Sequence, residues 1–135
     1  MKKEIITPDN VAKPAAPYGS AIKVKSTGSL VFVAGVLSCD IDGNVIYKGD
    51  ILAQTKQTVR NLIATLEAAG ARPEDVVKTT TYVVSSSMKE FFETKSFLEA
   101  LTPFNRPADT LVGVASLAGT ERGQLIEMDA IAVAD

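Results

Sequence analysis

The sequence predicts an α+β domain in which two helices pack on one face of a mixed β-sheet. Three observations lead to this fold class: short apolar or β-branched segments, two segments with the period of an amphipathic helix, and the order β, β, β, α, β, α, β, β along the chain. With 135 residues, of which 46% are hydrophobic and 22% charged, the chain is expected to form a single domain, residues 1–135, with a real core.

Three strands are expected before the first helix. Residues 3–7 and 21–25 are short strand candidates separated by a loop rich in Pro and Gly, and a turn is expected at Thr27–Gly28. Residues 29–34 (SLVFVA) are nearly all apolar, which predicts a central strand buried on both faces. Gly35 should end this strand, in a bulge or at a close backbone approach.

Both helices carry recognisable boundary signals. Asp50 is a good N-cap for an amphipathic helix over residues 51–69, and Gly70 is the expected stop. A capping box at residues 87–90 (SMKE) should open the second helix, which Pro103 ends.

The remaining strands follow from β-branched and apolar segments. Residues 75–85 read as one long strand, and residues 110–117 and 125–133 as two more. We expect residues 118–123 to join the last two strands as a hairpin turn. The strands are too apolar for both sheet faces to be wetted, and no third helix is available as a cover, so a homo-oligomer is expected.

Ionisable residues gather between Asn105 and Asp129. On the last strand Glu127 and Asp129 point to the same face, with Cα atoms about 6.8 Å apart by strand rise. Two such carboxylates can divide acid and base roles, or one can hold a water that the other orients. The alternative is that one is paired across the sheet while the other is solvated. Tyr18 lies in a loop that could present its hydroxyl to a pocket, although a packing role is equally open.

Composition excludes several kinds of site. The chain has no histidine and one cysteine, which rules out Ser-His-Asp and Cys-His catalysis, imidazole or thiolate metal sites and an intramolecular disulfide. The net charge of −2 argues against a nucleic-acid partner. No apolar run approaches the ~20 residues that span a bilayer, so no membrane association is expected and the cytoplasm is the default location.

The order and spacing of six segments resemble the RidA/YjgF family, also called the L-PSP or enamine/imine deaminase family. The resemblance covers nearly the whole chain, and its segments are residues 16–18 (APY), 30–35 (LVFVAG), 54–70, 75–80 (DVVKTT), 106–108 (RPA) and 126–132 (IEMDAIA). It implies a chorismate-mutase-like fold and a homotrimer whose sheets form a central barrel, with three pockets at the subunit clefts. It also implies hydrolysis of small enamines or imines to a 2-oxo acid and ammonia, without a cofactor.

The sequence departs from the family pattern at one position that matters. Deaminase members carry Pro-Ala-Arg, whose Arg grips the substrate carboxylate, whereas this chain has Pro107-Ala108-Asp109. A carboxylate at the guanidinium position repels such a substrate instead of clamping it. An alternative that the sequence leaves open is that Arg106 or Arg122 swings into the cleft and replaces the missing Arg.

The other site positions of the family are matched to individual residues of this sequence. By resemblance, Glu127 is the carboxylate that orients the attacking water, and Tyr18 is the pocket Tyr. Gly35 matches the family, whereas Ala34 takes the place of a small hydroxyl residue and Thr94 that of an Asn on the second helix.

Asp109 and the backbone near Val112 complete the expected site, and Asp129 replaces a second Glu. The leading hypothesis is a Rid-type hydrolase of altered specificity, acting on an imine, enamine or related small electrophile that is neutral or cationic near its reacting carbon. The alternative is a non-catalytic trimer that binds a small metabolite or a client protein. A ribonuclease is the least favoured option.

Overall fold

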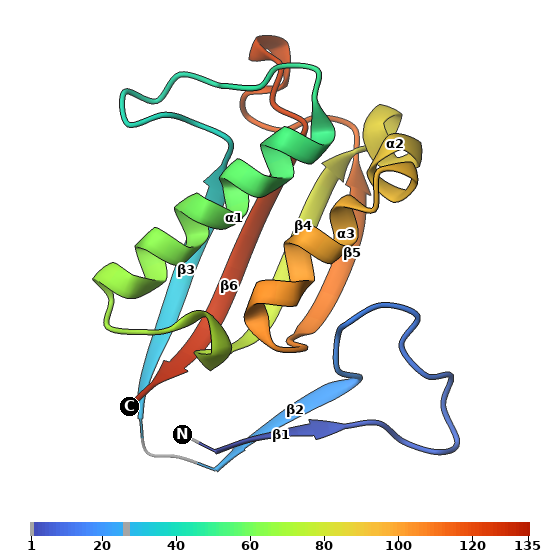
Figure 1. The fold of residues 1–135 in the computed structure, drawn as a ribbon, viewed down its shortest axis with the longest axis vertical. Helices are drawn as coiled ribbons and strands as arrows, with labels where there is room; N and C mark the ends of the chain where they lie inside the picture. Colours follow the sequence, from blue (N-terminus) through green and yellow to red (C-terminus); the bar gives the residue numbers. More distant parts are fainter. Residues whose placement is uncertain (1, 26–27) are drawn as a thin grey trace.

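A computed structural model describes residues 2–25 and 28–135. It contains a two-stranded and a four-stranded β-sheet, and the α-helices lie on one face of the four-stranded sheet (Figure 1). The turn expected at Thr27–Gly28 falls partly outside the described residues, because Thr27 is not among them.

The larger sheet has four strands in the order β3-β6-β4-β5. In chain order these are β3 (Ser29–Leu37), β4 (Val76–Val84), β5 (Ala108–Val114) and β6 (Ile126–Ala134). β6 is antiparallel to both of its neighbours, whereas β4 and β5 are parallel. The predicted mixed sheet is thus confirmed.

The first two strands form a separate antiparallel sheet, where a single mixed sheet was expected. β1 (Lys2–Ile6) pairs with β2 (Ala21–Lys25) alone among the described strands. Lys3 ties this hairpin to the main body of the domain. Its Nζ donates hydrogen bonds to the backbone carbonyls of Val76 at 2.9 Å, Phe104 at 3.1 Å and Asn105 at 2.7 Å.

The long helix begins and ends where its boundary residues predict. α1 spans Ile51–Ala68, and the Asp50 carboxylate accepts a hydrogen bond from the Ala53 amide at 3.0 Å. Gly70 adopts φ +78°, a left-handed conformation that suits glycine after a helix end.

The second predicted helix is two short helices, α2 (Met88–Glu93) and α3 (Ser96–Leu101). Lys95, between them, has φ 55° and ψ 31°, and this left-handed residue interrupts the helical path. The capping box expected from Ser87 is absent, because Ser87 has φ −102° and ψ −2° and makes no side-chain cap hydrogen bond. An N-cap serine needs an extended backbone for that bond.

Short 3-10 turns complete the connections. They are η1 (Pro73–Asp75), η2 (Ser85–Ser87), η3 (Thr102–Phe104) and η4 (Thr120–Arg122). η2 leads directly into α2, which explains the helical backbone of Ser87.

β3 is an edge strand, and the prediction of a central strand buried on both faces was wrong. It pairs with β6 alone among the described strands, and Leu30 and Phe32 are 63% and 71% exposed. Within one chain the helices cover only one face of the sheet, so apolar residues on the other face remain open. The prediction that Gly35 ends the strand was wrong, because β3 continues to Leu37. The predicted irregularity at Gly35 is confirmed, because the β3–β6 register shifts between Val33 and Val36.

The hairpin predicted between the last two strands was also wrong, because β4 lies between β5 and β6. The connection crosses from one side of β4 to the other and is fixed to α1 by Gln54. The Gln54 amide donates to the Gly123 carbonyl at 2.8 Å and its Oε1 accepts from the Leu125 amide at 2.8 Å.

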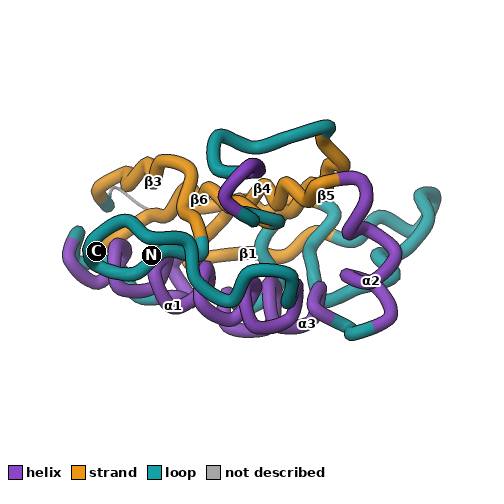
Figure 2. Tube along the Cα trace, turned by 90° about the horizontal axis from the view of Figure 1, so that it is seen from above, coloured by secondary structure: helices purple, strands orange, loops and turns teal. Residues whose placement is uncertain are grey.

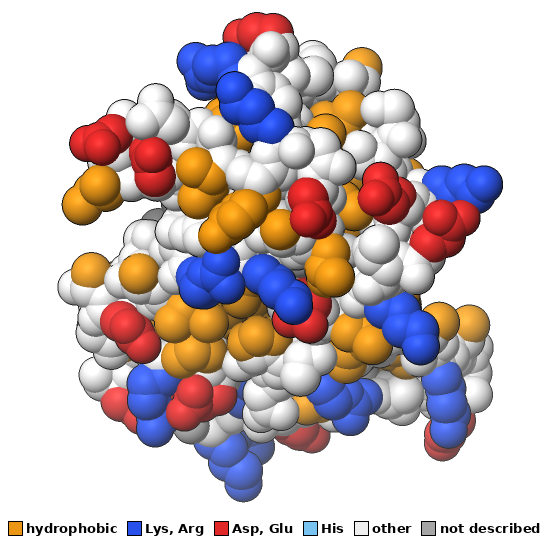
Figure 3. All heavy atoms as spheres, turned by 45° about the horizontal axis from the view of Figure 1, so that its top comes forward, with side chains coloured by type: hydrophobic (Ala, Val, Ile, Leu, Met, Phe, Trp, Pro, Cys, Tyr) orange, Lys and Arg blue, Asp and Glu red, His pale blue; other side chains and the backbone are white. Residues whose placement is uncertain are grey.

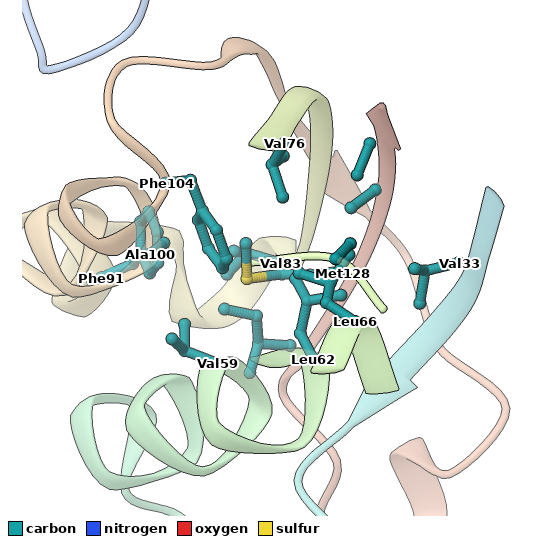
Figure 4. Close-up of a cluster of buried hydrophobic side chains, with 14 of the residues drawn as sticks. Val33, Val59, Leu62, Leu66, Val76, Val83, Phe91, Ala100, Phe104 and Met128 are labelled. Carbon is teal, nitrogen blue, oxygen red and sulfur yellow. The ribbon is translucent and has the colours of Figure 1, made fainter. Parts of the chain in front are cut away.

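The core lies between the helices and the covered sheet face (Figure 2). Figure 4 shows side chains from α1, α2, α3 and the sheet that meet there, including Leu62, Leu66, Val83, Phe91, Phe104 and Met128. The alternation of β6 places Ile126, Met128 and Ala130 in this core, and hence Glu127 and Asp129 on the opposite, uncovered face.

Candidate active site

A cavity of about 420 Å³ opens on the helix side of the sheet. Its walls come from the loop before β2, from β4 and β5, and from α2 and α3. The lining side chains are mostly apolar or aromatic: Ala15, Ala16, Tyr18, Thr81, Phe91, Phe92, Phe97, Ala100, Leu101, Asp109 and Leu111. Asp109 is the one carboxylate among them.

Parallel pairing of β4 with β5 holds Asp109 in this wall. Thr79 lies directly opposite Asp109 in the register, and its hydroxyl donates to Asp109 Oδ1 at 2.7 Å. The Thr81 hydroxyl, two residues along β4, donates to the same oxygen at 3.2 Å. Burial raises the pKa of Asp109, while the two threonine hydrogen bonds and the positive charge of Lys78 oppose that rise.

Tyr18 reaches the same cavity from the N-terminal loop. The Gly19 amide donates to the Pro107 carbonyl at 3.0 Å, which places Tyr18 beside the start of β5. The structure therefore brings Tyr18 and Asp109 together, as the resemblance implied.

Glu127 lies on the other face of the sheet, against β3. It pairs in register with Leu37 on one side and Tyr82 on the other. A Cβ placed on Gly35 would come within 2.8 Å of Glu127 Cδ, a distance that real side chains do not adopt. The carboxylate thus packs on the bare backbone of the β3 bulge, and only glycine leaves room for it.

Two further residues shape the surroundings of Glu127. Burial and the negative charge of Asp129 raise its pKa, in that order of importance. The Tyr82 hydroxyl donates to Asp129 Oδ2 at 3.3 Å, and the negative charge of Asp129 is the main cause of a raised pKa at Tyr82. Sequence reasoning missed Tyr82, although the alternation of β4 puts it on the same face as Glu127.

The other predicted site residues are scattered. Ala34 is exposed on β3 beside Gly35, and Val112 lies opposite Tyr82 on the uncovered face. Thr94 caps the end of α2, where its hydroxyl bonds to the Glu90 carbonyl at 2.7 Å. None of these three lines the Asp109 cavity.

The two arginines considered as substitutes for the missing clamp do not line this cavity either. Arg106 is exposed with φ 55°, and Arg122 is exposed in η4. Asp109 therefore meets no guanidinium within the described part of the cavity wall.

Within one chain the site is divided in two. Tyr18 and Asp109 form a cavity on the helix face, and Glu127 with Asp129 and Tyr82 forms an acidic cluster on the uncovered face. The first part can hold a small organic molecule, and the second can take a proton from water.

Among the described residues, no group of three or more acidic or cysteine side chains is placed to hold a metal ion. No helix among them is long and apolar enough to cross a membrane.

Comparison with known proteins identifies the family. Residues 9–134 match the family described as Endoribonuclease L-PSP, so the chain belongs to that family, which confirms the RidA/YjgF resemblance. The chain is 39% identical over 132 residues to a RutC family protein of Pyrococcus abyssi, with 98% of each chain covered.

Other relatives carry names that state an activity. A 2-iminobutanoate/2-iminopropanoate deaminase of Dermatophagoides farinae is 31% identical, over 97% of this chain and 96% of its own. A 3-aminoacrylate deaminase RutC of Acinetobacter baylyi is 30% identical, over 87% of this chain and 98% of its own.

Among solved structures, the fold resembles YyfB of Yersinia pestis, a protein of unknown function in the conserved Rid family. The TM-score is 0.78 at 28% identity, over 98% of this chain and 99% of YyfB. The α+β, YjgF-like fold is thereby shown.

Proposed function

We propose that this protein is a Rid-type hydrolase that acts on a small imine or enamine in a cleft between the subunits of a homotrimer. The observation that carries the proposal is the placement of Glu127 on the glycine bulge of β3. Its partly buried carboxylate, with a raised pKa, suits a group that takes a proton from water near neutral pH.

The reaction needs no change in oxidation state. Water adds to the carbon of a protonated C=N group while Glu127 accepts one of its protons. That proton then passes to the nitrogen. The carbon–nitrogen bond breaks as Glu127 accepts the remaining hydroxyl proton, so that a neutral carbonyl compound and ammonia leave, and Glu127 returns this proton to ammonia or to solvent. Tyr18 would orient the substrate.

The division of the site supports assembly from more than one chain. Asp109 and Glu127 lie on opposite faces of one sheet, so a single cleft can contain both only if a neighbouring copy supplies one of them. The exposed Leu30 and Phe32 give the uncovered face an apolar surface suited to burial against other copies. A closed ring of three copies would meet both requirements.

Specificity should differ from that named for the deaminases among the relatives. Their named substrates, 2-iminobutanoate, 2-iminopropanoate and 3-aminoacrylate, are carboxylates. Asp109 stands where an Arg would grip that group, and the Thr79 and Thr81 hydroxyls stabilise it as an anion. We therefore expect a substrate that is neutral or cationic near its reacting carbon.

The experiment is Glu127→Gln, assayed on a panel of imines generated in place by an oxidase and trapped with semicarbazide. Loss of a general base predicts a fall in kcat of about 10²–10⁴-fold. Ligand binding in the Asp109 cavity should persist, since Glu127→Gln keeps the size of the side chain and leaves Asp109 and the lining of the cavity in place. Unchanged turnover in the variant would contradict the role of Glu127.

A non-catalytic trimer that binds a small molecule, or acts in a chaperone-like way, is the second candidate. It is favoured by the fact that the Asp109 cavity is lined without any contribution from Glu127. Binding of a small ligand with no turnover of any imine in the panel would select it. Endoribonuclease activity, named in the family description, has less support: Lys, Arg, Asp and Glu are interspersed on the face drawn in Figure 3, and the net charge is −2.

A further inference from the structure

We propose that the Asp109 cavity binds a small apolar molecule through a cationic nitrogen, either a primary ammonium or an iminium. The inference deepens the proposed function by naming the charge and character of its ligand. The binding event itself needs no catalysis and can be tested alone.

The size and lining of the cavity fit a small ligand whose main part is apolar. Its volume of about 420 Å³ falls within the ~300–1,000 Å³ typical of small-molecule pockets. Phe92 packs between two other rings, edge-on to Phe91 at 5.9 Å and tilted against Phe97 at 5.7 Å between centroids. Phe91 is 1% exposed and forms a fixed floor, while Phe92 is half exposed at the surface.

One oxygen of the Asp109 carboxylate is held by the protein and the other is open. Both threonine hydroxyls donate to Oδ1. Oδ2 is not among the buried side-chain oxygens that lack a hydrogen-bond partner, so it can accept from water or from a ligand in the cavity. An ammonium or iminium N–H is the donor that bonds most strongly to a carboxylate.

Charge in the rest of the wall favours the same ligand. None of the described residues that line the cavity is Lys or Arg, so no cation there competes for Asp109. Lys78, the nearest cation acting on Asp109, lies on the uncovered sheet face and donates to Thr110 at 2.8 Å. The aromatic rings add attraction for a cation held above their faces.

The test compares three probes of similar shape: 2-phenylethylamine hydrochloride, 2-phenylethanol and 3-phenylpropanoate. Calorimetry on the whole protein at pH 7 should give the amine a Kd about 10-fold lower than the alcohol, as expected for a hydrogen bond to a charged group. The acid should bind most weakly. Amide NMR shifts should centre on Leu111 and Phe97.

Two matched variants localise the effect. Asp109→Asn should abolish the preference for the amine, whereas Asp42→Asn, on an exposed loop outside the cavity wall, should leave it unchanged. Should Asp109→Asn fail to fold, the three-probe comparison on the unmodified protein still decides the matter.

The proposal is overturned if the acid binds as tightly as the amine, or if none of the three binds at millimolar concentration. Amine binding without imine turnover would sink the proposed hydrolase while leaving this inference intact. Turnover of 2-imino carboxylates without amine binding would do the reverse.

Discussion

Asp109 and Glu127 lie on opposite faces of the same four-stranded sheet, although the family resemblance implies that both belong to one active site. Asp109 accepts hydrogen bonds from Thr79 and Thr81, which face the helices, whereas Glu127 alternates with the fully buried Met128 and faces away from them. A common site therefore requires two copies of the chain.

This arrangement predicts subunit complementation. Asp109→Lys and Glu127→Gln should each be inactive alone, the first because Lys repels a cationic substrate. Co-assembled trimers should regain activity at about one site in three, where an intact Asp109 of one copy meets an intact Glu127 of the next. Turnover by the mixed assemblies, purified through two different tags, measures this. Mixed trimers as inactive as their parents would show that no active site combines Asp109 of one copy with Glu127 of the next.

The close approach of Glu127 to Gly35 predicts a sensitive backbone position. Gly35→Ala puts a methyl group within 2.8 Å of the Glu127 carboxyl carbon, which must move. Because the Glu127 carboxyl group is the end of a flexible side chain, we expect it to be displaced, with a lower kcat and only a small loss in the free energy of unfolding.

Gly113→Ala is the matched control for that change. Its added Cβ meets only the Ser85 Oγ at 3.3 Å and the Met88 Cε at 3.4 Å, both ends of side chains that can shift. Urea unfolding and turnover should show a smaller effect than for Gly35→Ala. Equal effects of the two substitutions on stability and turnover would contradict a specific role for the contact between Gly35 and Glu127.

The pH dependence of turnover should report the environment of Glu127. A general base must be ionised, and burial and Asp129 raise the pKa of Glu127, so activity falls at a higher pH than for an ordinary Glu. Asp129→Asn removes the like charge and should move the acidic limb of log kcat/KM to lower pH. Asp42→Asn, on an exposed loop, should leave the acidic limb at the same pH. An acidic limb that does not move in Asp129→Asn would show that Asp129 does not raise the pKa of Glu127.

The same shift has a consequence for stability. Because the folded pKa of Glu127 is raised, the folded state binds more protons than the unfolded state between the ordinary and the raised value, and stability falls as pH rises through that window. Glu127→Gln should therefore raise Tm slightly at pH 7 while reducing activity. Calorimetry at pH 7 measures this, and a lowered Tm would contradict the raised pKa.

Lys3 should hold the N-terminal hairpin to the domain. Lys3→Met leaves the carbonyls of Val76, Phe104 and Asn105 without that donor, and we expect a loss of about 1–3 kcal/mol in unfolding free energy. Lys23→Met, an exposed change in the same hairpin, is the control. Hydrogen exchange in β1 and β2 should accelerate in Lys3→Met only.

The pH dependence of this anchor has a definite sign. Burial lowers the pKa of Lys3 from 10.5 to about 8, so between these values the unfolded chain binds more protons than the folded one. The stability of the natural protein relative to Lys3→Met should thus increase from pH 8 towards pH 10. A relative stability that falls over this range would contradict the lowered pKa.

Much of the fold could be predicted because local signals decide it. Asp50 and Gly70 fix the ends of α1 through a side-chain cap and a left-handed residue, both of which are local properties. Strand order is not local, so nothing in residues 118–123 revealed that β4 separates the strands they join. The apolar residues of β3 were read as buried on both sides, whereas the helices cover one side only.

The roles of the candidate site residues stay predictions, and the sequence indicated only part of their arrangement. Glu127 and Asp129 share a face because strands alternate, and this is confirmed. The Thr79–Asp109 contact depends on the parallel register of β4 with β5, and the Tyr82–Asp129 contact on the antiparallel register with β6. Neither register can be read from the segments themselves.

The most direct test of the altered specificity compares two substrates on the unmodified protein, with the 2-iminobutanoate/2-iminopropanoate deaminase of Dermatophagoides farinae assayed beside it. Each of the two proteins receives 2-iminobutanoate and the imine formed from butylamine by an amine oxidase, which carries no carboxylate, and kcat/KM is measured for both substrates. The charge at Asp109 predicts that this protein prefers the butylamine-derived imine. Hydrolysis of 2-iminobutanoate at a rate like that of the mite deaminase would contradict it.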